Sequence, residues 1–240
     1  MKNLKNITME TNRTELYNQW VDKVCQYIEE VGPKLNLPGS VMQSRPVLDR
    51  QPGVVFLGFN SHEEWGYCGL KRERFFDGNP FFYENRMSET WKVWKRPYEA
   101  FKSVNYLNPM TDGNYVFMNA VYFGSKDIKT LKATTDGKEA IDRCLDFTEE
   151  VIQNVFKPKC VVCFSQNDCF APLRTKFKFG QVETVTPTNF DGQPAKKTVI
   201  KGLWNSIPVY GIPHPSGRIN YDDWGGIALY LKKEMEQLGV

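Results

Sequence analysis

One of the two histidines in this 240-residue chain, His214, stands between two prolines at the end of an apolar run. The surrounding stretch, Ile207 to Asn220, reads IPVYGIPHPSGRIN. A neutral imidazole can stabilise a developing anion by donating a hydrogen bond, without first giving up a proton. The prolines fix the backbone on both sides and remove competing N–H donors. We interpret His214 as a functional group held at a set depth, and a structural histidine in a rigid turn is the alternative.

Polar residues also mark three other apolar runs. Asn60 ends GVVFLGFN, Asn119 lies within NYVFMNAVYF, and Ser165 and Gln166 end CVVCFSQ. An amide inside an apolar run needs a hydrogen-bond partner, because leaving it unpaired costs roughly 1–3 kcal/mol. A turn asparagine is the alternative interpretation for Asn60, and a buried amide bonded to the backbone is the alternative for Asn119.

These runs predict four strands that are buried on both faces, at 53–60, 114–123, 160–166 and 207–212. Amphipathic patterns predict helices at 14–31, 88–104, 136–157, from about 168, and at 221–238. Strands that alternate with helices are typical of an α/β protein with a parallel sheet. We therefore expect one domain over 1–240, with an N-terminal helix at 14–31 and a core at 53–238. Its architecture would be three-layered, α/β/α, around a central four-stranded parallel sheet.

The carboxyl ends of parallel strands meet at one edge of the sheet, where ligands usually bind. Asn60, Ser165 and His214 fall at such ends, and Asn119 lies within or ends the second strand, which predicts one shared site. Two segments lie outside this scheme. Residues 61–80 have no clear period and predict a long functional loop, whereas 178–202 predict a hairpin or an irregular excursion.

Taken in order, LGFN, FMN, CFSQ and HPSGR resemble the landmarks of the uracil-DNA glycosylase superfamily. Its first motif is written G-x-D-P-Y or G-x-N-P-G, and its last is H-P-S-P-L or H-P-S-P-R. The resemblance spans roughly 53–238, and the Asn60 and Arg218 positions are most similar to the single-strand-selective monofunctional branch. The resemblance implies the α/β fold of that superfamily. It also implies a monofunctional hydrolase that flips uracil or a related damaged pyrimidine out of DNA and cleaves its N-glycosidic bond.

The resemblance also implies roles for individual residues. His214 would donate a hydrogen bond to the departing base, and Asn60 would position the attacking water. Asn60 could orient that water but could not act as a general base. Asn119 would pair with the uracil edge, since an amide offers one donor and one acceptor to N3–H and O4.

Contacts to DNA follow from the same resemblance. Arg218 would be the wedge that fills the gap left by the extruded base, or would meet a phosphate, and a solvated surface arginine is the alternative. Ser216 would contact a phosphate, and Ser165 and Gln166 would contact the backbone of the DNA.

The base also requires an aromatic ring to stack on. By spacing, Phe75 and Phe76 are the nearest candidates, and Phe59 adjoins Asn60. Further candidates are Trp65, Tyr67, Phe81 and Phe82. His62 stands where one branch has a tyrosine that excludes the methyl group of thymine, although an exposed loop histidine is equally compatible with the sequence.

The chain departs from the superfamily pattern in three places. The first motif lacks its proline, Gly217 replaces the second proline of H-P-S-P, and residues 71–85 fit no branch of the superfamily. A non-catalytic nucleic-acid or nucleobase binder therefore remains the main alternative function. A hydrolase acting on small N-glycosides is a third possibility.

Composition sets the remaining expectations. The formal net charge of +3 permits a nucleic-acid partner but does not require one. The six cysteines are irregularly spaced and do not form an iron–sulfur quartet, and we interpret the C-x-x-C at 160–163 as buried strand cysteines. The first residues lack the apolar core of a signal peptide and no run of ~18 apolar residues occurs, so we expect neither a secreted nor a membrane-spanning protein. We expect a cytoplasmic monomer that acts on DNA without metal, cofactor or membrane.

Overall fold

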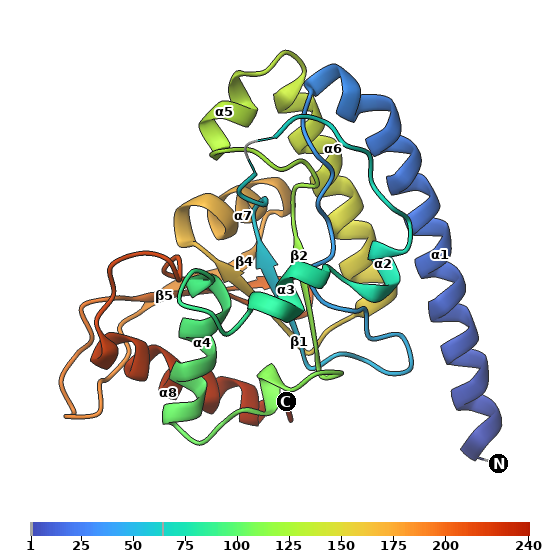
Figure 1. Ribbon diagram of the computed structural model, residues 1–240. Coiled ribbons are helices and arrows are strands. Elements are labelled where there is room, and N and C mark those ends of the chain that lie inside the picture. The colour runs from blue at the N-terminus through green and yellow to red at the C-terminus, as the bar shows by residue number, and fades with distance from the viewer. Residues whose placement is uncertain (1, 64) are drawn as a thin grey trace.

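The computed structural model describes residues 2–63 and 65–240, which form a mixed six-stranded sheet between two layers of helices (Figure 1). In sheet order the strands are β2 (Tyr115–Asn119), β1 (Val54–Gly58), β3 (Cys160–Phe164), β6 (Ile207–Ile212), β5 (Val199–Trp204) and β4 (Gly180–Val185). The first four run parallel, whereas β5 and β4 are each antiparallel to their neighbours.

The predicted α/β class is confirmed, but the sheet is not the four-stranded parallel sheet that the sequence predicted. The segment 178–202 forms a hairpin that joins the same sheet. A tight turn at Asn205, whose φ is 56°, connects β5 to β6 and pairs Trp204 with Ile207. This turn leaves the chain no room for a crossover helix, so β5 and β6 can only be antiparallel.

Continuous apolar runs form the central strands because both faces of the sheet are covered. In β1, Val55 and Leu57 face one hydrophobic core, whereas Val54 and Phe56 face the other. The first core is covered by α1 (Lys2–Leu35), α2 (Arg74–Asp77), α5 (Ile128–Ala133), α6 (Gly137–Glu150), η2 (Val151–Phe156) and α7 (Ala171–Phe177). The second core is covered by α3 (Pro80–Asn85), α4 (Lys92–Ser103) and α8 (Tyr221–Gln237).

Two short elements complete the chain path, η1 (Asn108–Met110) before β2 and η3 (Gln166–Phe170) after β3. The first helix is longer than the predicted 14–31, because it continues through Gly32 and Pro33 to Leu35. Its buried stripe includes Trp20, whose Nε1 donates to the carbonyl oxygen of Phe147 at 2.8 Å.

A non-helical edge segment, residues 38–44, covers the outer edge of β2. It makes antiparallel bridges between Gly39 and Phe123 and between Met42 and Met118. The backbone N–H groups of Gln43 and Ser44 both donate to the Phe117 carbonyl oxygen. The edge segment therefore satisfies backbone groups that an edge strand would otherwise expose.

All six cysteines are free thiols. Cys160 and Cys163 contribute to opposite cores, so the two thiols of the C-x-x-C lie on different faces of β3, as expected for buried strand cysteines. No helix among the described residues is both long and apolar enough to cross a membrane.

Candidate functional site

The four parallel strands bring the predicted polar residues to one edge of the sheet. In register, Gly58 pairs with Asn119, Leu57 with Cys163 and Phe164 with Ile212. The residues that directly follow these positions are therefore neighbours from strand to strand. Asn60, Asn119, Ser165 and His214 consequently share this edge, as the sequence predicted.

Asn119 is a buried residue, 4% exposed, at the last position of β2. Its Nδ2 donates to the Ser40 carbonyl oxygen at 3.1 Å and approaches Ser40 Oγ at 3.5 Å. Its Oδ1 lies only 2.9 Å from where a Cβ would stand on Gly58, so a side chain at position 58 would displace the amide. No described residue donates a hydrogen bond to Oδ1, which leaves this acceptor for a ligand.

Asn60 is half-buried and its amide nitrogen is fully engaged. Nδ2 donates to Ser125 Oγ at 2.8 Å and to the carbonyl oxygens of Ser61 and Phe123 at 3.3 and 3.4 Å. The Ser125 hydroxyl in turn donates to the Asp127 carbonyl oxygen at 2.8 Å, so it can only accept from Asn60. These contacts fix the orientation of the amide and leave Oδ1 as an acceptor, which can orient a water molecule.

His214 has a defined tautomer. Its Nδ1 lies 2.7 Å from Ser216 Oγ and 3.3 Å from the Ser216 backbone nitrogen. The backbone N–H can only donate, so Nδ1 is the acceptor and the neutral ring carries its proton on Nε2. The His214 side chain is exposed at the surface, yet desolvation by the protein atoms around its ring lowers its pKa, and the charge of Asp168 opposes this effect. A neutral ring with an Nε2–H donor is therefore the form present at pH 7.

The loop that carries His214 is held from α4. Arg96 Nη1 donates to the Pro215 carbonyl oxygen at 2.7 Å and also to the Gly217 carbonyl oxygen. Arg218, the predicted wedge, is exposed and makes no hydrogen bond or ion pair with the described residues. Its side chain is thus available for a ligand outside the protein.

Ser165 and Gln166 build the turn after β3. Ser165 has a φ of 126° and is buried, and its Oγ caps η3 by accepting from the Asp168 backbone nitrogen at 2.9 Å. Gln166 Nε2 donates to the carbonyl oxygens of Thr198 and Gly211 at 2.6 and 3.3 Å. Both side chains are committed to internal contacts, so contact with DNA by either is not supported by the geometry.

The aromatic residues predicted by spacing, Phe59, Phe75 and Phe76, pack in the core on the side of the sheet away from Asn119. Phe75 is 1% exposed and packs edge-on against Trp20 of α1, and Phe76 packs against Tyr17. Phe59 is 5% exposed and belongs to the same core. Tyr115 and Phe117, which share the face of Asn119, belong to the other core. None of the three predicted rings is placed to stack on a base held by Asn119.

Phe81 of α3 is the better aromatic candidate. Its ring is 53% exposed and lies edge-on to Trp91 at 5.7 Å between centroids. The neighbouring Phe82 belongs to the core on the Asn119 side of the sheet, which places α3 on that side. The N-cap residue Asn79 accepts from the Phe81 backbone nitrogen at 3.1 Å, so the start of α3 is fixed.

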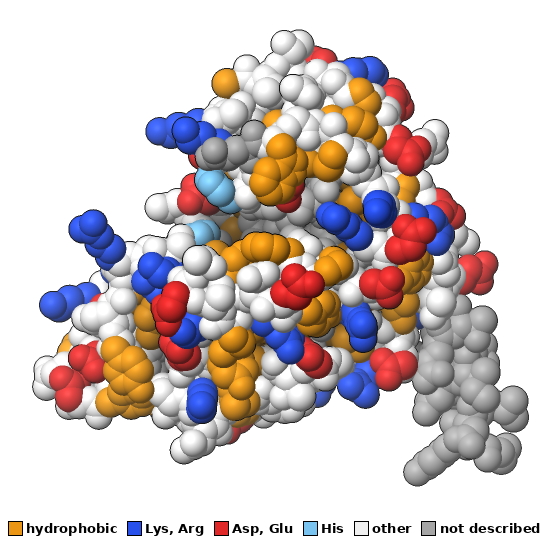
Figure 2. Space-filling view, viewed as in Figure 1, with side chains coloured by type: hydrophobic (Ala, Val, Ile, Leu, Met, Phe, Trp, Pro, Cys, Tyr) orange, Lys and Arg blue, Asp and Glu red, His pale blue; other side chains and the backbone are white. Residues whose placement is uncertain are grey.

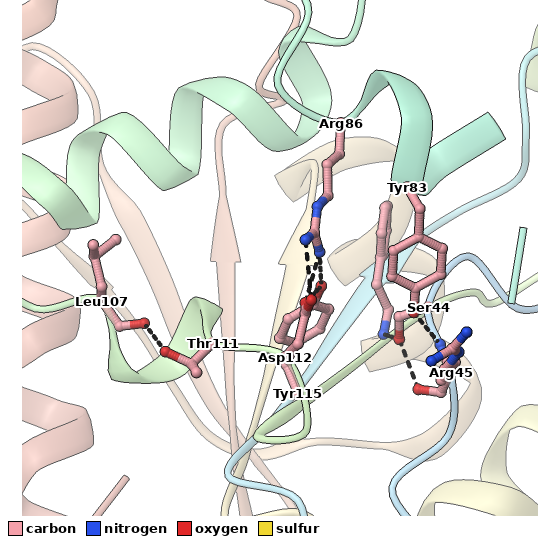
Figure 3. A network of polar contacts seen from close by, with 9 residues as sticks. Ser44, Arg45, Tyr83, Arg86, Leu107, Thr111, Asp112 and Tyr115 are labelled. Carbon is pink, nitrogen blue, oxygen red and sulfur yellow. Dashed lines mark hydrogen bonds and ion pairs between the residues drawn. The ribbon is translucent and has the colours of Figure 1, made fainter. Parts of the chain in front are cut away.

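The other end of α3 is fixed by a charged network near the amino-terminal end of β2 (Figure 3). Arg86 makes a bidentate pair with Asp112, with distances of 2.6 and 3.0 Å, and also donates to the Tyr115 hydroxyl at 3.0 Å. The pair lowers the pKa of Asp112. The Tyr83 hydroxyl accepts from the Arg45 backbone nitrogen at 2.7 Å, which ties α3 to the residue that follows the edge segment.

His62 lies beside Ser125, with which it forms a parallel bridge. Its Nδ1 is 2.7 Å from the Lys126 carbonyl oxygen, so this nitrogen carries a proton. Both histidines of the chain are visible on one face of the molecule, where they border a hollow (Figure 2). His62 is thus exposed near Asn60, and its predicted role in excluding the methyl group of thymine stays a prediction.

Two of the cavities formed by the described residues have no lining from Asn60, Asn119 or His214. The larger, about 510 Å³, lies over β4 and β5 beside the end of α8. The smaller, about 10 Å³, is lined by Ser40 and Phe75 among others and has room for one water molecule. The candidate site is therefore a hollow at the surface rather than one of these cavities.

Several residues of the site carry no signal in the sequence. Ser40, Gln43, Ser125 and Arg96 act through hydrogen bonds to residues far along the chain, and no local pattern marks such contacts. Spacing from Asn60 places Phe81 among the further aromatic candidates, behind Phe75 and Phe76, although the pattern N-P-F at 79–81 predicts the start of a helix.

Within residues 2–63 and 65–240, no three His, Cys, Asp or Glu side chains are grouped closely enough to hold a metal ion. Comparisons with protein-family models, with curated proteins and with solved structures found no match to this chain.

Proposed function

We propose that this protein is a monofunctional DNA glycosylase that hydrolyses the N-glycosidic bond of uracil or a related damaged pyrimidine. The observation that carries the proposal is the shared strand edge, where Asn60, Asn119 and His214 each have one polar atom engaged and another left for a ligand. The resemblance of the four sequence motifs to uracil-DNA glycosylases supports the same assignment.

Departure of the base is the step that His214 would assist. As the bond between the sugar C1′ and the base N1 breaks, the bonding electron pair leaves with the base and positive charge develops on the sugar. The Nε2–H of a neutral His214 can donate to an oxygen of the departing anion. A donor that is already oriented stabilises this charge without reorganisation, which is usually the largest electrostatic contribution to catalysis.

Attack by water completes the reaction. The oxygen of a water held by Asn60 Oδ1 would bond to C1′, and its released proton would pass to solvent. Asparagine cannot take that proton, so the proposal requires a sugar cation that is already well developed when water adds. The three contacts that orient the Asn60 amide are consistent with a role in positioning rather than in proton transfer.

Recognition of the base would fall to Asn119 and Phe81. The target nucleotide must leave the helical stack to reach this edge. Asn119 would accept from N3–H through Oδ1 and donate to O4, while the exposed Phe81 ring would stack on the base. Arg218 would occupy the gap in the DNA or meet a phosphate.

A strand-cleavage assay tests the proposal. Single- and double-stranded oligonucleotides with one uracil would be incubated with protein and then treated with alkali, which cuts at abasic sites. We expect cleavage by the wild type and a large loss in His214→Ala, with Asn189→Ala, a substitution in the hairpin loop, as the control. Cleavage no greater than with His214→Ala would contradict the proposal.

A non-catalytic binder of nucleic acid or nucleobase is the second candidate. It is favoured by two departures from the superfamily pattern, the first motif without its proline and the unusual segment 71–85. Affinity for uracil-containing DNA without any release of base, unchanged in His214→Ala, would support this alternative.

A further inference from the structure

The amide of Asn119 can read either uracil or cytosine, depending on which way it is turned. With Oδ1 toward the base N3 and Nδ2 toward position 4, it complements the N3–H and O4 of uracil. Turned by 180°, it complements the N3 acceptor and the N4 amino group of cytosine. A glycosylase that acts on uracil must therefore fix this orientation, since cytosine is a normal base.

The Ser40 carbonyl oxygen can impose that orientation, because it only accepts hydrogen bonds. It receives Asn119 Nδ2 at 3.1 Å. Turning the amide would replace this hydrogen bond by two facing acceptors, Oδ1 and the Ser40 carbonyl oxygen. The second contact of Nδ2, to Ser40 Oγ at 3.5 Å, lies at the limit of a hydrogen bond, so the other N–H can donate to a base. The contact therefore favours the form of Asn119 that reads uracil.

Gln43 holds Ser40 and the start of α3 together. Its side chain is buried, and its Nε2 donates to Ser40 Oγ at 3.3 Å. Its Oε1 accepts from Asn79 Nδ2 at 3.1 Å, and its backbone carbonyl oxygen accepts from the Asn79 backbone nitrogen at 3.0 Å. Asn79 in turn caps the helix that carries Phe81.

A connected set of polar groups thus runs from the buried Asn119, Ser40 and Gln43 to the half-buried Asn79, which caps the helix that carries the exposed Phe81. Ser40, Gln43 and Asn119 are 8%, 4% and 4% exposed. A buried polar network is favourable only when its members are satisfied, so removal of the central amide would leave partners on both sides unpaired.

We propose that Gln43 is a positioning residue for base specificity, which holds the Asn119 amide in its uracil-reading orientation and aligns it with the Phe81 ring. This inference rests on the proposed function. It assigns discrimination between uracil and cytosine to the edge segment, a part of the chain outside all four motifs.

The test compares single-turnover release of uracil and of cytosine from otherwise identical oligonucleotides. Gln43→Met keeps the length of the side chain and removes its amide. We expect the ratio of uracil to cytosine release to fall at least tenfold. Gln153→Met is a matched control, because Gln153 Nε2 is buried and has no hydrogen-bond partner. We expect that control to leave the ratio unchanged.

Gln43→Glu should restore most of the ratio of uracil release to cytosine release. A carboxyl group can accept from Asn79 and bond the Ser40 hydroxyl, which is free to turn and donate. A purely structural role for Gln43 would lower both release rates together and leave their ratio constant, and that result would overturn the inference. If Gln43→Met does not fold, Ser40→Ala removes the same link at its other end and is expected to lower the ratio.

A second measurement does not depend on turnover. Hydrogen exchange of the Asn119 side-chain amide, followed by nuclear magnetic resonance, should be slow in the wild type and in Gln153→Met and faster in Gln43→Met. Equal exchange in all three would overturn the role of Gln43. A wild type that releases no uracil would contradict the proposed function, whereas the exchange result would still decide whether Gln43 positions Asn119.

Discussion

Asn60 Nδ2 and Ser125 Oγ are 2.8 Å apart, although 65 positions separate the two residues in the chain. Ser125 is 1% exposed, and its hydroxyl proton is directed to the Asp127 carbonyl oxygen. The hydroxyl therefore presents only a lone pair to Asn60. This contact determines which end of the Asn60 amide is left to orient water.

Ser125→Ala should slow base release without preventing folding. Loss of the acceptor allows the Asn60 amide to turn, and misplacement of a catalytic group by about 1 Å can slow a reaction about a hundredfold. We expect single-turnover rates to fall by about tenfold to a hundredfold. Ser125→Thr keeps the hydroxyl and should retain most activity, and Ser103→Ala on α4 is the control. An unchanged rate in Ser125→Ala would show that Asn60 does not depend on this contact.

The pH dependence of base release should report the protonation of His214. The proposed mechanism needs the neutral ring, so the rate should be constant at neutral pH and fall as pH drops through the pKa of His214, which lies below its ordinary value. Asp168 raises that pKa against the effect of burial. Asp168→Asn should therefore move the acid limb of the profile to lower pH. Movement to higher pH, or none, would contradict this assignment.

Phe81→Ala and Phe75→Ala should separate function from stability. Phe81 is exposed, so its loss should change the free energy of unfolding by no more than about 0.5 kcal/mol. Loss of base stacking should weaken binding or catalysis by about 1–3 kcal/mol. Phe75 is fully buried, and Phe75→Ala should destabilise the fold by about 3–5 kcal/mol. Chemical denaturation and single-turnover kinetics on both variants would check this, and equal activity of Phe81→Ala and wild type would exclude Phe81 as the stacking ring.

The contrast between Phe81 and Phe75 shows that the sequence did not predict on which side of the sheet each ring packs. Spacing from Asn60 selected Phe75, but the side of the sheet on which a loop residue packs depends on the path of residues 61–80, which have no period. The four central strands could be predicted because short continuous apolar runs bounded by polar residues are typical of strands buried on both faces.

The contacts of the edge segment and of the hairpin could not be predicted from the sequence either. Ser40 and Gln43 lie in a non-periodic stretch, and their contacts to Asn119 and Asn79 join residues that are 79 and 36 positions apart. The sequence predicts a hairpin or an irregular excursion at 178–202, and the alternation of its residues is that of any exposed hairpin. Only the tight turn at Asn205 commits it to the edge of the central sheet.

Asp112 should stabilise the protein at neutral pH and lose this effect in acid. Its pKa is lowered chiefly by the hydrogen bonds from Arg86, so the stabilisation is complete above the ordinary carboxyl pKa and is lost as pH falls through the lowered value. Because the Asp112 side chain is 58% exposed, solvent screening limits the effect to about 1 kcal/mol. Thermal unfolding of Asp112→Asn should differ from wild type at pH 7 and converge with it in strong acid.

The exposed pair of Arg50 and Asp49 provides the control for that measurement. Its atoms are 3.6 Å apart and both side chains are more than half exposed, so Asp49→Asn should change stability little at any pH. A constant difference between Asp112→Asn and wild type across the pH range would show that the charge of Asp112 is not what fixes α3.

The most direct test of the central claim is detection of the released base itself. Mass spectrometry of the products formed from a uracil-containing single-stranded oligonucleotide should find free uracil over repeated turnovers of the wild-type protein. Asn60→Ala, Asn119→Ala and His214→Ala should each slow its release, the last by about a hundredfold to a thousandfold, as for loss of a preorganised donor. Free uracil that does not exceed the amount formed with His214→Ala would contradict the account.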